Sequence, residues 1–399
     1  MRLLNPTPNN KLSLPAPGAD ALAASLALQQ LIAAEISAHA GQISFARYME
    51  LALYAPQLGY YSGGAAKLGK DGDFTTAPEM SPLFGATLAH VAANLFAQTS
   101  AQMMEFGAGS GRLAFDILSE YQASGTLLER YFIVELSGEL RARQEALLKD
   151  FPQVVWLQAM PEEFSGVVLG NEVLDAMPVS LVVNTGQGWA ECFVTLAQDA
   201  AGAPFMLTQH ACDAALVAQI PEAASMPVGY LTEVHPVAAG FMRSLGQMLV
   251  AGHARTGHAG VAILIDYGFP AQEYYIDQRG QGTLMCHYRH HAHPDPFYLP
   301  GLQDITAHVD FTAMAQAALD AGLDLLAYTS QAGFLLEAGI AQLLLRTPVE
   351  DIAQYLPAAN ALQKLTSPAE MGELFKVLVV GCGAEIDAAL LRHDRSHRL

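Results

Sequence analysis

The feature that most constrains the fold is a glycine turn that closes a short apolar segment. It reads Glu105-Phe-Gly-Ala-Gly-Ser-Gly111 and stands between a strand-like run, 103–106, and a helix-like run, 113–121. Alternating glycines permit a tight turn and close approach of a ligand to the backbone, and the following helix offers unpaired N–H groups. A dinucleotide fingerprint, G-x-G-x-x-G, would need glycine at Arg112. The turn therefore predicts a nucleotide-type ligand other than a dinucleotide, and a turn without any cofactor is the alternative.

Strands and helices alternate after this turn, which is typical of a doubly wound α/β sheet. The predicted strand 130–135 ends in Glu135, and ligands of open α/β sheets lie at the carboxyl ends of the strands. We therefore expect Glu135 to accept the two hydroxyls of a ribose. The alternative is a charge that stabilises the N-terminus of the helix after Ser137. Further strands are expected at 154–157, 165–170, 260–267 and 374–380.

Two regions interrupt the alternation. Residues 179–236 read as a β-rich insertion, and 268–309 as a loop-rich segment that contains several histidines. Helices are expected over residues 20–39, with Asp20 as the cap, and over 331–345. Further helices are expected to begin after Ser44, after Asp310 and at the capping box Ser367-Pro-Ala-Glu370. We therefore divide the chain into four regions: an N-terminal helical segment with a cofactor-covering loop (1–98), a cofactor-binding half (99–178), the insertion (179–236), and the remainder (237–399).

Five motifs appear in order between Ser44 and Val380. They are Gly72-Asp-Phe-Thr-Thr-Ala-Pro-Glu79, Glu105-Phe-Gly-Ala-Gly-Ser-Gly111, Gly170-Asn-Glu-Val-Leu-Asp-Ala-Met-Pro178, Ile265-Asp-Tyr-Gly268 and Asp304-Ile-Thr-Ala-His-Val-Asp-Phe311. In these motifs the chain resembles the MidA-like family, whose mitochondrial member is a complex I assembly factor with protein arginine methyltransferase activity. The resemblance implies a class I S-adenosylmethionine (SAM) methyltransferase: a Rossmann-like α/β fold with a seven-stranded, mostly parallel sheet, a helical N-terminal segment and a β-rich insertion. It also implies SAM as the cofactor.

The predicted SAM site combines the glycine turn with neighbouring loops. The loop 72–79 is expected to close over the cofactor, with a solvated surface loop as the alternative. Asn171 either contacts SAM or bridges it to the acceptor. The predicted cofactor-binding residues are Glu105, Gly107, Gly109, Gly111, Glu135, Asn171, Phe74, Thr75 and Pro78.

Two acids after the fourth predicted strand are candidates for binding an arginine acceptor. The guanidinium is a poor nucleophile because it stays protonated, and carboxylates can grip it bidentately and orient one nitrogen. Glu172 and Asp175 stand where arginine methyltransferases place such a pair, and their spacing lets them share a face if the segment forms a helical turn. The alternative is that Asn171 and Asp175 only cap a helix.

A second group of polar residues is a candidate for proton transfer. His308 is predicted to take the proton after methyl transfer, with Asp304 orienting its ring; a structural histidine that caps the next helix is an equal alternative. Glu79, Glu233 and Tyr267 are weaker candidates for binding the substrate. No metal is expected at the histidines of 287–293, because methyl transfer needs none and Arg289 would repel a cation.

Composition excludes several classes of partner. A formal net charge of −19 disfavours nucleic acid, and 52% hydrophobic with 15% charged residues indicates a folded globular protein. No membrane partner is expected, because Ala21–Ala34 reads as an amphipathic helix. Four widely spaced cysteines favour a reducing compartment, and we expect the protein to be cytoplasmic.

The substrate prediction is a protein that contains arginine, with a respiratory-complex subunit as one option. Two rivals stay open: methylation of a small molecule or another side chain, and a non-catalytic assembly factor that binds SAM. A homodimer is a further prediction, because the apolar helices at 20–39 and 331–345 suit either a core or a subunit interface.

Overall fold

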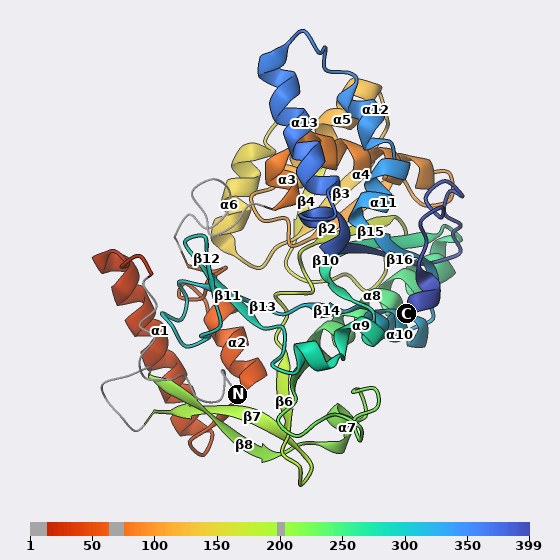
Figure 1. The fold of residues 1–399 in the computed structure, drawn as a ribbon. Coiled ribbons are helices and arrows are strands. Elements are labelled where there is room, and N and C mark those ends of the chain that lie inside the picture. The colour runs from red at the N-terminus through yellow and green to blue at the C-terminus, as the bar shows by residue number, and fades with distance from the viewer. Residues whose placement is uncertain (1–13, 64–75, 198–203) are drawn as a thin grey trace. The chain divides into compact units, whose positions relative to one another are not determined.

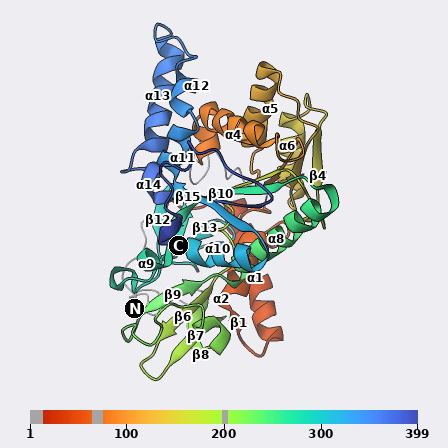
Figure 2. The same ribbon diagram turned by 90° about the vertical axis from the view of Figure 1, so that its right-hand side faces the viewer.

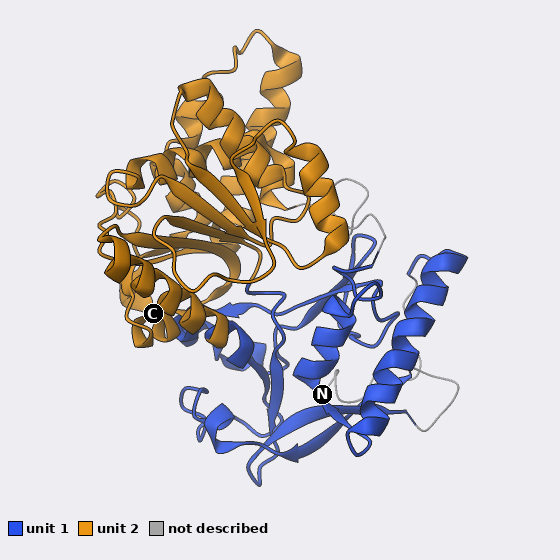
Figure 3. Cartoon of the chain, turned by 180° about the vertical axis from the view of Figure 1, so that it is seen from behind, with its two compact units in different colours: residues 1–74, 174–239, 271–313 blue, residues 75–173, 240–270, 314–399 orange. Residues whose placement is uncertain are grey.

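The computed structural model describes residues 14–63, 76–197 and 204–399. The chain divides into two compact units that are each assembled from separate segments (Figure 3). Unit 1 comprises residues 1–74, 174–239 and 271–313, and unit 2 comprises 75–173, 240–270 and 314–399. The predicted regions divide the chain differently, because 75–98 belongs to unit 2 and 271–313 belongs to unit 1.

Unit 2 contains the predicted doubly wound sheet (Figure 1). Its strands run in the order β15-β16-β10-β5-β2-β3-β4. The strands from β10 to β4 are parallel, and β16 is antiparallel to both β10 and β15, so the expectation of a mostly parallel sheet is confirmed. The strand bounds are β2 Gln102–Phe106, β3 Arg130–Val134, β4 Val154–Leu157, β5 Val167–Asn171, β10 Gly260–Phe269, β15 Asp324–Ser330 and β16 Phe375–Cys382.

Helices cover this sheet, and their apolar side chains form its main hydrophobic core. Phe84 and Leu88 of α4 pack with Ile117 of α5 and with sheet residues such as Met103 and Ile133. Figure 2 shows α13 beside α11 and α12. The helix bounds are α3 Ala77–Met80, α4 Pro82–Leu95, α5 Arg112–Ser124, α6 Gly138–Leu147, α8 Pro236–Thr256, α10 Phe311–Asp320, α11 Gln331–Glu337, α12 Ile340–Leu344, α13 Ile352–Thr366, α14 Met371–Leu374 and η2 Ser396–Arg398.

Unit 1 joins the N-terminal helices to the β-rich insertion. One sheet runs β1-β7-β6-β9 with β8 paired to β7, and a second runs β12-β11-β13. The bounds are α1 Ala19–Ala38, β1 Ile43–Ser44, α2 Phe45–Tyr54, β6 Ser180–Asn184, β7 Trp189–Leu196, β8 Phe205–Ala211, α7 Ala214–Val217, β9 Leu231–Val234, α9 Ala271–Tyr274, η1 Asp277–Arg279, β11 Met285–Tyr288, β12 His291–His293, β13 Asp304–Thr306 and β14 Val309–Asp310. The β-rich insertion is confirmed.

Helix α1 is amphipathic in its contacts. Leu28, Ile32 and Ile36 are buried in the core of unit 1, at the spacing of one helical face. Among the residues that the structure describes, α1 is also the helix that is long and apolar enough to span a membrane, by length and composition alone. Its side chains thus supply part of a protein core.

Several local expectations were wrong. The segment 268–309 is loop-rich, as predicted, but it also contains α9 and the short strands of the β12-β11-β13 sheet, which were not predicted. The expected helix 331–345 is two helices, because the left-handed Gly339 (φ +92°) stops the hydrogen-bond ladder between α11 and α12. Glu370 precedes the short α14 without a side-chain cap, so the expected capping box does not form. Helix α13 contains Pro357 and was not predicted.

The predicted caps had mixed outcomes. The Ser44 hydroxyl accepts the Arg47 N–H at 3.2 Å, and the Asp310 carboxylate accepts the Ala313 N–H at 3.2 Å, so both caps are confirmed. Asp20 does not cap α1, because Gly18 occupies the cap position without a side-chain bond. Asp20 lies instead in the first turn, where its charge still suits the helix dipole.

Candidate active site

The glycine turn joins β2 to α5 in a left-handed backbone. Gly107, Gly109 and Gly111 have φ values of +67°, +53° and +85°. A Cβ on Gly107 would lie 2.8 Å from Val173 Cγ2, and a Cβ on Gly111 would lie 3.2 Å from Gln144 Cγ. The turn therefore needs glycine both for its conformation and for the close approach of neighbouring chain.

The turn lies at the topological switch point of the sheet. β2 pairs with β3 on one side and with β5 on the other, so the strand order reverses between β2 and β5. Ligands of open α/β sheets bind in the crevice at this position, outside the carboxyl ends of the strands. Asn171 ends β5 there, and its buried Oδ1 has no hydrogen-bond partner among the described residues. An unsatisfied acceptor beside a left-handed glycine turn fits a cofactor that donates hydrogen bonds.

Glu135 follows β3 and is tied to the glycine turn through Gln144. The Glu135 carboxylate accepts the Ser137 N–H at 2.8 Å and the Gln144 Nε2–H at 2.9 Å. Gln144 also donates to the Gly109 carbonyl at 3.0 Å and accepts the Trp156 indole N–H at 3.0 Å. The carboxylate is therefore held close to the turn, as a ribose-binding role requires.

Gln144 and Trp156 were missed by sequence reasoning. Gln144 is the buried residue of the otherwise exposed helix α6, and its exposed fraction is 0%. A buried glutamine usually satisfies several partners. The sequence carries no periodic or motif signal for this position, because its partners come from the glycine turn, the β3–α6 connection and strand β4.

Glu105 is an interior residue of β2. It is 2% exposed, and its carboxylate accepts the Tyr131 hydroxyl at 2.7 Å. Burial raises the pKa of Glu105 to about 7, the Tyr131 hydrogen bond lowers it, and Glu135 raises it slightly further. The Glu105 carboxylate therefore ties β2 to the neighbouring strand β3 just before the glycine turn.

The predicted covering loop is only partly described. Phe74 and Thr75 lie outside the described residues. Pro78 is buried in α3, and the Glu79 carboxylate accepts a hydrogen bond from the Ser110 hydroxyl in the glycine turn. Glu79 thus contacts the cofactor turn, whereas the sequence had suggested a substrate-binding role.

Comparisons with known proteins identify the family. Residues 86–329, more than half of the chain, match a family model described as "Putative S-adenosyl-L-methionine-dependent methyltransferase". The chain belongs to this methyltransferase family. It is a SAM-dependent methyltransferase of the MidA-like type. The assignment of the glycine turn, Glu135 and Asn171 to SAM binding stays a prediction, with which the unpartnered Asn171 Oδ1 is compatible.

Individual relatives of known name or structure are also similar to this chain over most of its length. The chain is 52% identical to a Burkholderia thailandensis protein solved with bound S-adenosyl-homocysteine, with a TM-score of 0.88 over 97% of this chain and 100% of that one. A second structure from that organism gives 51% identity and a TM-score of 0.86 over the same shares of the two chains. The mitochondrial protein arginine methyltransferase NDUFAF7 of Mus musculus is 30% identical over 90% of this chain and 83% of its own, and that of Homo sapiens is 28% identical over 89% and 81%.

The acid Glu172 of this methyltransferase has an unusual backbone. It follows β5 with a φ of +55°, donates its N–H to the Ile265 carbonyl at 2.9 Å and accepts the Asn171 Nδ2–H at 3.0 Å. Residues 172–178 form a turn rather than a helix. Glu172 and Asp175 therefore share no helical face, and the helix that Asn171 and Asp175 would cap in the alternative interpretation is also absent.

Asp175 and Asp304 lie in unit 1. The Asp175 carbonyl accepts the Ala307 N–H at 3.0 Å, and the Tyr61 hydroxyl donates to both Asp304 oxygens at 3.0 Å. Tyr61 is therefore a hydrogen-bond partner of Asp304. The backbone N–H of His308 donates to the Thr283 hydroxyl at 3.1 Å. The pairing of Asp304 with the His308 ring stays a prediction.

The other weak substrate candidates have structural roles. Glu233 is 0% exposed, and its carboxylate accepts the N–H groups of Thr283 and Leu284 at 2.9–3.0 Å and the Tyr274 hydroxyl at 3.1 Å. The ring of Tyr267 packs edge-on against Phe375 with centroids 5.5 Å apart. Both side chains therefore have partners within the fold, and their substrate-binding roles stay predictions.

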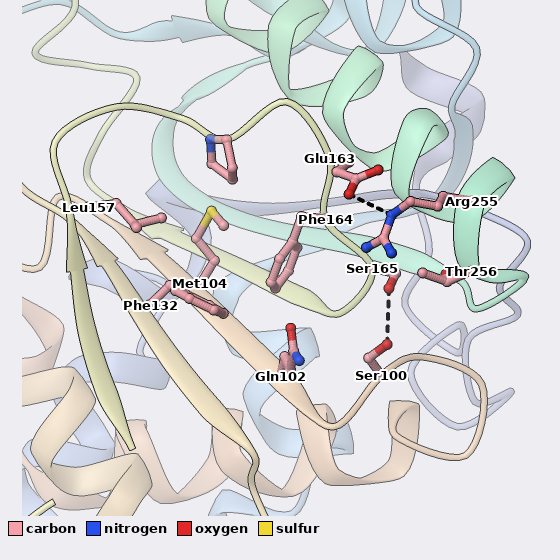
Figure 4. Close-up of a pocket in the computed structure, with 11 residues that line it drawn as sticks. Ser100, Gln102, Met104, Phe132, Leu157, Glu163, Phe164, Ser165, Arg255 and Thr256 are labelled. Atoms are coloured by element: carbon pink, nitrogen blue, oxygen red, sulfur yellow. Dashed lines mark hydrogen bonds and ion pairs between the residues drawn. The ribbon is translucent and has the colours of Figure 1, made fainter. Parts of the chain in front are cut away.

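A separate cavity of about 300 Å³ lies on the sheet of unit 2 (Figure 4). The connection 158–166 crosses from β4 to β5 without a helix, and the cavity is lined there by Met104, Phe132 and Leu157. Arg255 pairs with Glu163 at its rim. None of the predicted SAM residues lines it. Within the described part of the chain, no group of three or more histidine, cysteine, aspartate or glutamate side chains is arranged to hold a metal ion.

Proposed function

We propose that this methyltransferase transfers the methyl group of SAM to an arginine side chain of a protein substrate. The observation that carries the proposal is the strained backbone of Glu172. A left-handed non-glycine residue costs about 1–2 kcal/mol, and such strain gathers at functional sites. Glu172 stands at the end of β5, beside the switch point. Relatives named protein arginine methyltransferases, which match 90% of the chain at 30% identity, support arginine as the acceptor.

The chemistry asks the protein mainly for positioning and for charge. When bound, SAM supplies a methyl group on a sulfonium: an arginine nitrogen lone pair forms the new N–C bond as the S–C bond breaks, sulfur keeps the bonding pair, and the arginine releases one proton. The carboxylates of Glu172 and Asp175 are assigned to grip the guanidinium and orient one nitrogen. A carboxylate or the ring of His308 receives the released proton.

A transfer experiment tests the proposal. Radiolabelled SAM and the purified protein are added to a lysate that lacks the protein, and labelled bands are analysed by mass spectrometry. We expect methylarginine in a protein. Label on another side chain or in a small molecule supports the corresponding rival enzyme and refutes the arginine proposal. Binding of S-adenosyl-homocysteine without any transfer supports a non-catalytic assembly factor.

The variant Glu172→Gln separates binding from chemistry. We expect it to bind S-adenosyl-homocysteine like the wild type and to lose about 100-fold or more in transfer rate, because the carboxylate charge is removed from the acceptor. Glu162→Gln, which changes an exposed glutamate of the β4–β5 connection, is the matched control. Full transfer activity of Glu172→Gln on the identified substrate would show that Glu172 does not orient the acceptor.

Three further assignments complete the proposal. A respiratory-complex subunit is one candidate substrate, and the mass spectrometry identifies or excludes it. We propose a cytoplasmic location, with which the free thiols of all four cysteines are compatible; cell fractionation tests it. The homodimer prediction is tested by light scattering of the purified protein.

A further inference from the structure

The two-strand pair β11–β13 in unit 1 has one polar face. The antiparallel register places Met285 opposite Thr306 and His287 opposite Asp304. Directly opposite side chains lie on the same face of a pair, so this face carries Met285, His287, Asp304 and Thr306. The intervening Cys286 and Ile305 point to the other face and are buried in the core of unit 1.

Aromatic rings stand beside the acid of this face. The Tyr61 hydroxyl contacts both oxygens of Asp304, which is 0% exposed, and the Tyr61 ring stacks on that of Tyr54 with centroids 5.5 Å apart at 24°. Burial and the charge of Asp304 raise the pKa of Tyr61 well above its usual value, so the phenol keeps its proton and acts as a hydrogen-bond donor. Tyr54 is 39% exposed, so solvent reaches the stacked pair.

A second carboxylate lies close to the same rings. Asp175 is 5% exposed, and its carbonyl accepts the N–H of Ala307, the residue after Thr306. Burial and then the negative charges of Asp304 and Asp175 raise the pKa of Tyr54, whose hydroxyl donates to the Ala176 carbonyl at 2.9 Å. Two acids that are far apart in the sequence therefore act on one pair of phenols.

Thr306 supplies an independent indication of a ligand. Its hydroxyl belongs to a residue that is 2% exposed, and the atom has no hydrogen-bond partner among the described residues. A buried hydroxyl without a partner costs about 1–3 kcal/mol. It shares the face of Asp304 because successive strand residues alternate. The face reaches solvent at Met285, which lies directly opposite Thr306 and is 38% exposed.

We propose that this face binds the guanidinium group of the acceptor arginine; we call it the carboxylate–tyrosine site and define it by Tyr54, Tyr61, Asp175, Asp304 and Thr306. The inference rests on the proposed function. A guanidinium is planar and cationic and has several N–H donors, so it stacks on phenol rings and donates to carboxylates and to a hydroxyl. The neutral isostere citrulline lacks the charge, and the lysine ammonium lacks the plane.

Binding of small probes tests the site independently of turnover. The full-length protein saturated with S-adenosyl-homocysteine is titrated with Nα-acetyl-arginine amide, and binding is followed by NMR. We expect saturable binding in the millimolar range, at least tenfold weaker binding of Nα-acetyl-citrulline amide, and weaker binding of Nα-acetyl-lysine amide. Equal affinities for the arginine and citrulline probes, or no saturation by the arginine probe, would overturn the proposal.

Thr306→Val separates a ligand-binding role from a structural one. Because the hydroxyl has no protein partner among the described residues, replacing it by a methyl group should leave the free energy of unfolding unchanged or raise it. A ligand-binding hydroxyl predicts several-fold weaker binding of the arginine probe. Asp304→Asn should weaken the probe at least tenfold, and His291→Asn, on the exposed end of β12, is the control that should not change it.

The outcomes distinguish this inference from the proposed function. If transfer labels arginine in a protein but Thr306→Val and Asp304→Asn keep wild-type transfer and probe affinity, the site is wrong and the function stands. If transfer labels another residue or a small molecule, the function is wrong whatever the probe does. All variants should bind S-adenosyl-homocysteine within twofold of the wild type, which shows that they are folded.

Discussion

Replacing Gly107 by alanine tests the most specific steric claim about the cofactor turn. The left-handed backbone, with φ of +67°, costs a non-glycine residue about 1–2 kcal/mol. The new Cβ would also lie 2.8 Å from Val173 Cγ2, well inside the roughly 3.5–4.0 Å of a normal carbon contact. Overpacking of this kind costs about 1–3 kcal/mol. The sum is roughly 2–5 kcal/mol.

Two comparison variants divide that sum. Gly125 also has a positive φ, +74°, but a Cβ there would meet no atom within 4 Å, so Gly125→Ala should show the backbone cost alone. Val173→Ala removes the methyl group that Gly107→Ala would contact. The double variant Gly107→Ala/Val173→Ala should therefore recover the steric part of the loss and keep the backbone part, as a positive coupling in a double-mutant cycle.

The measurement uses the two tryptophans. In a Trp189→Phe background, Trp156 fluorescence reports urea unfolding of unit 2, and calorimetry gives the affinity for S-adenosyl-homocysteine. The variant turn can relieve its strain by rearranging, and ligand binding must then restore the strained form. Each 1.4 kcal/mol needed for this weakens binding about tenfold. We expect at least tenfold weaker binding for Gly107→Ala and no change for Gly125→Ala. Equal stability of these two variants, with wild-type affinity in both, would refute the steric reasoning.

Three further predictions concern single side chains. Gln144→Leu should weaken the binding of S-adenosyl-homocysteine about tenfold in calorimetry, because it removes the hydrogen bonds to the Gly109 carbonyl and to Glu135. The control Arg143→Ala, at the exposed neighbouring residue, should not change the affinity. The pKa of Glu105 is raised in the folded state to about 7, so the folded protein binds its proton more tightly; stability is greatest below about 4.5 and falls as pH rises to 7, and Glu105→Gln should remove this slope in urea titrations. Glu233→Gln should lower the free energy of unfolding by about 1.5–3 kcal/mol through weaker bonds to two backbone N–H groups, while S-adenosyl-homocysteine still binds. Unchanged stability in that variant would contradict the structural role of Glu233.

Sequence reasoning succeeded wherever the physical cause was local. The glycine turn, the strand that ends before Glu135, and the caps at Ser44 and Asp310 depend on neighbouring residues, and each forms as expected. It failed where distant partners decide. The segment 268–309 has no clear alternation, yet its strands pair with one another across a long loop.

The candidate site shows the same division at the level of single residues. The spacing of Asp304 and His308 led to the prediction that Asp304 orients the histidine ring. No sequence pattern indicated that the Tyr61 hydroxyl, 243 positions away in the sequence, donates to the Asp304 carboxylate. Glu233 was a weaker candidate for binding the substrate, and in the structure its carboxylate accepts the backbone N–H groups of Thr283 and Leu284. A carboxylate in a sequence does not reveal whether its oxygens are satisfied inside the fold.

The sequence by itself therefore determined the class of fold and the cofactor, because left-handed turns need glycine and a parallel sheet binds ligands where its strands end. The tertiary structure decided which polar side chains are buried, which are already bonded, and which are grouped. The SAM turn is a local motif and could be recognised in one stretch of chain. The carboxylate–tyrosine site includes Tyr61, Asp175 and Asp304, which come from three separate segments. Only the folding of unit 1 brings them together.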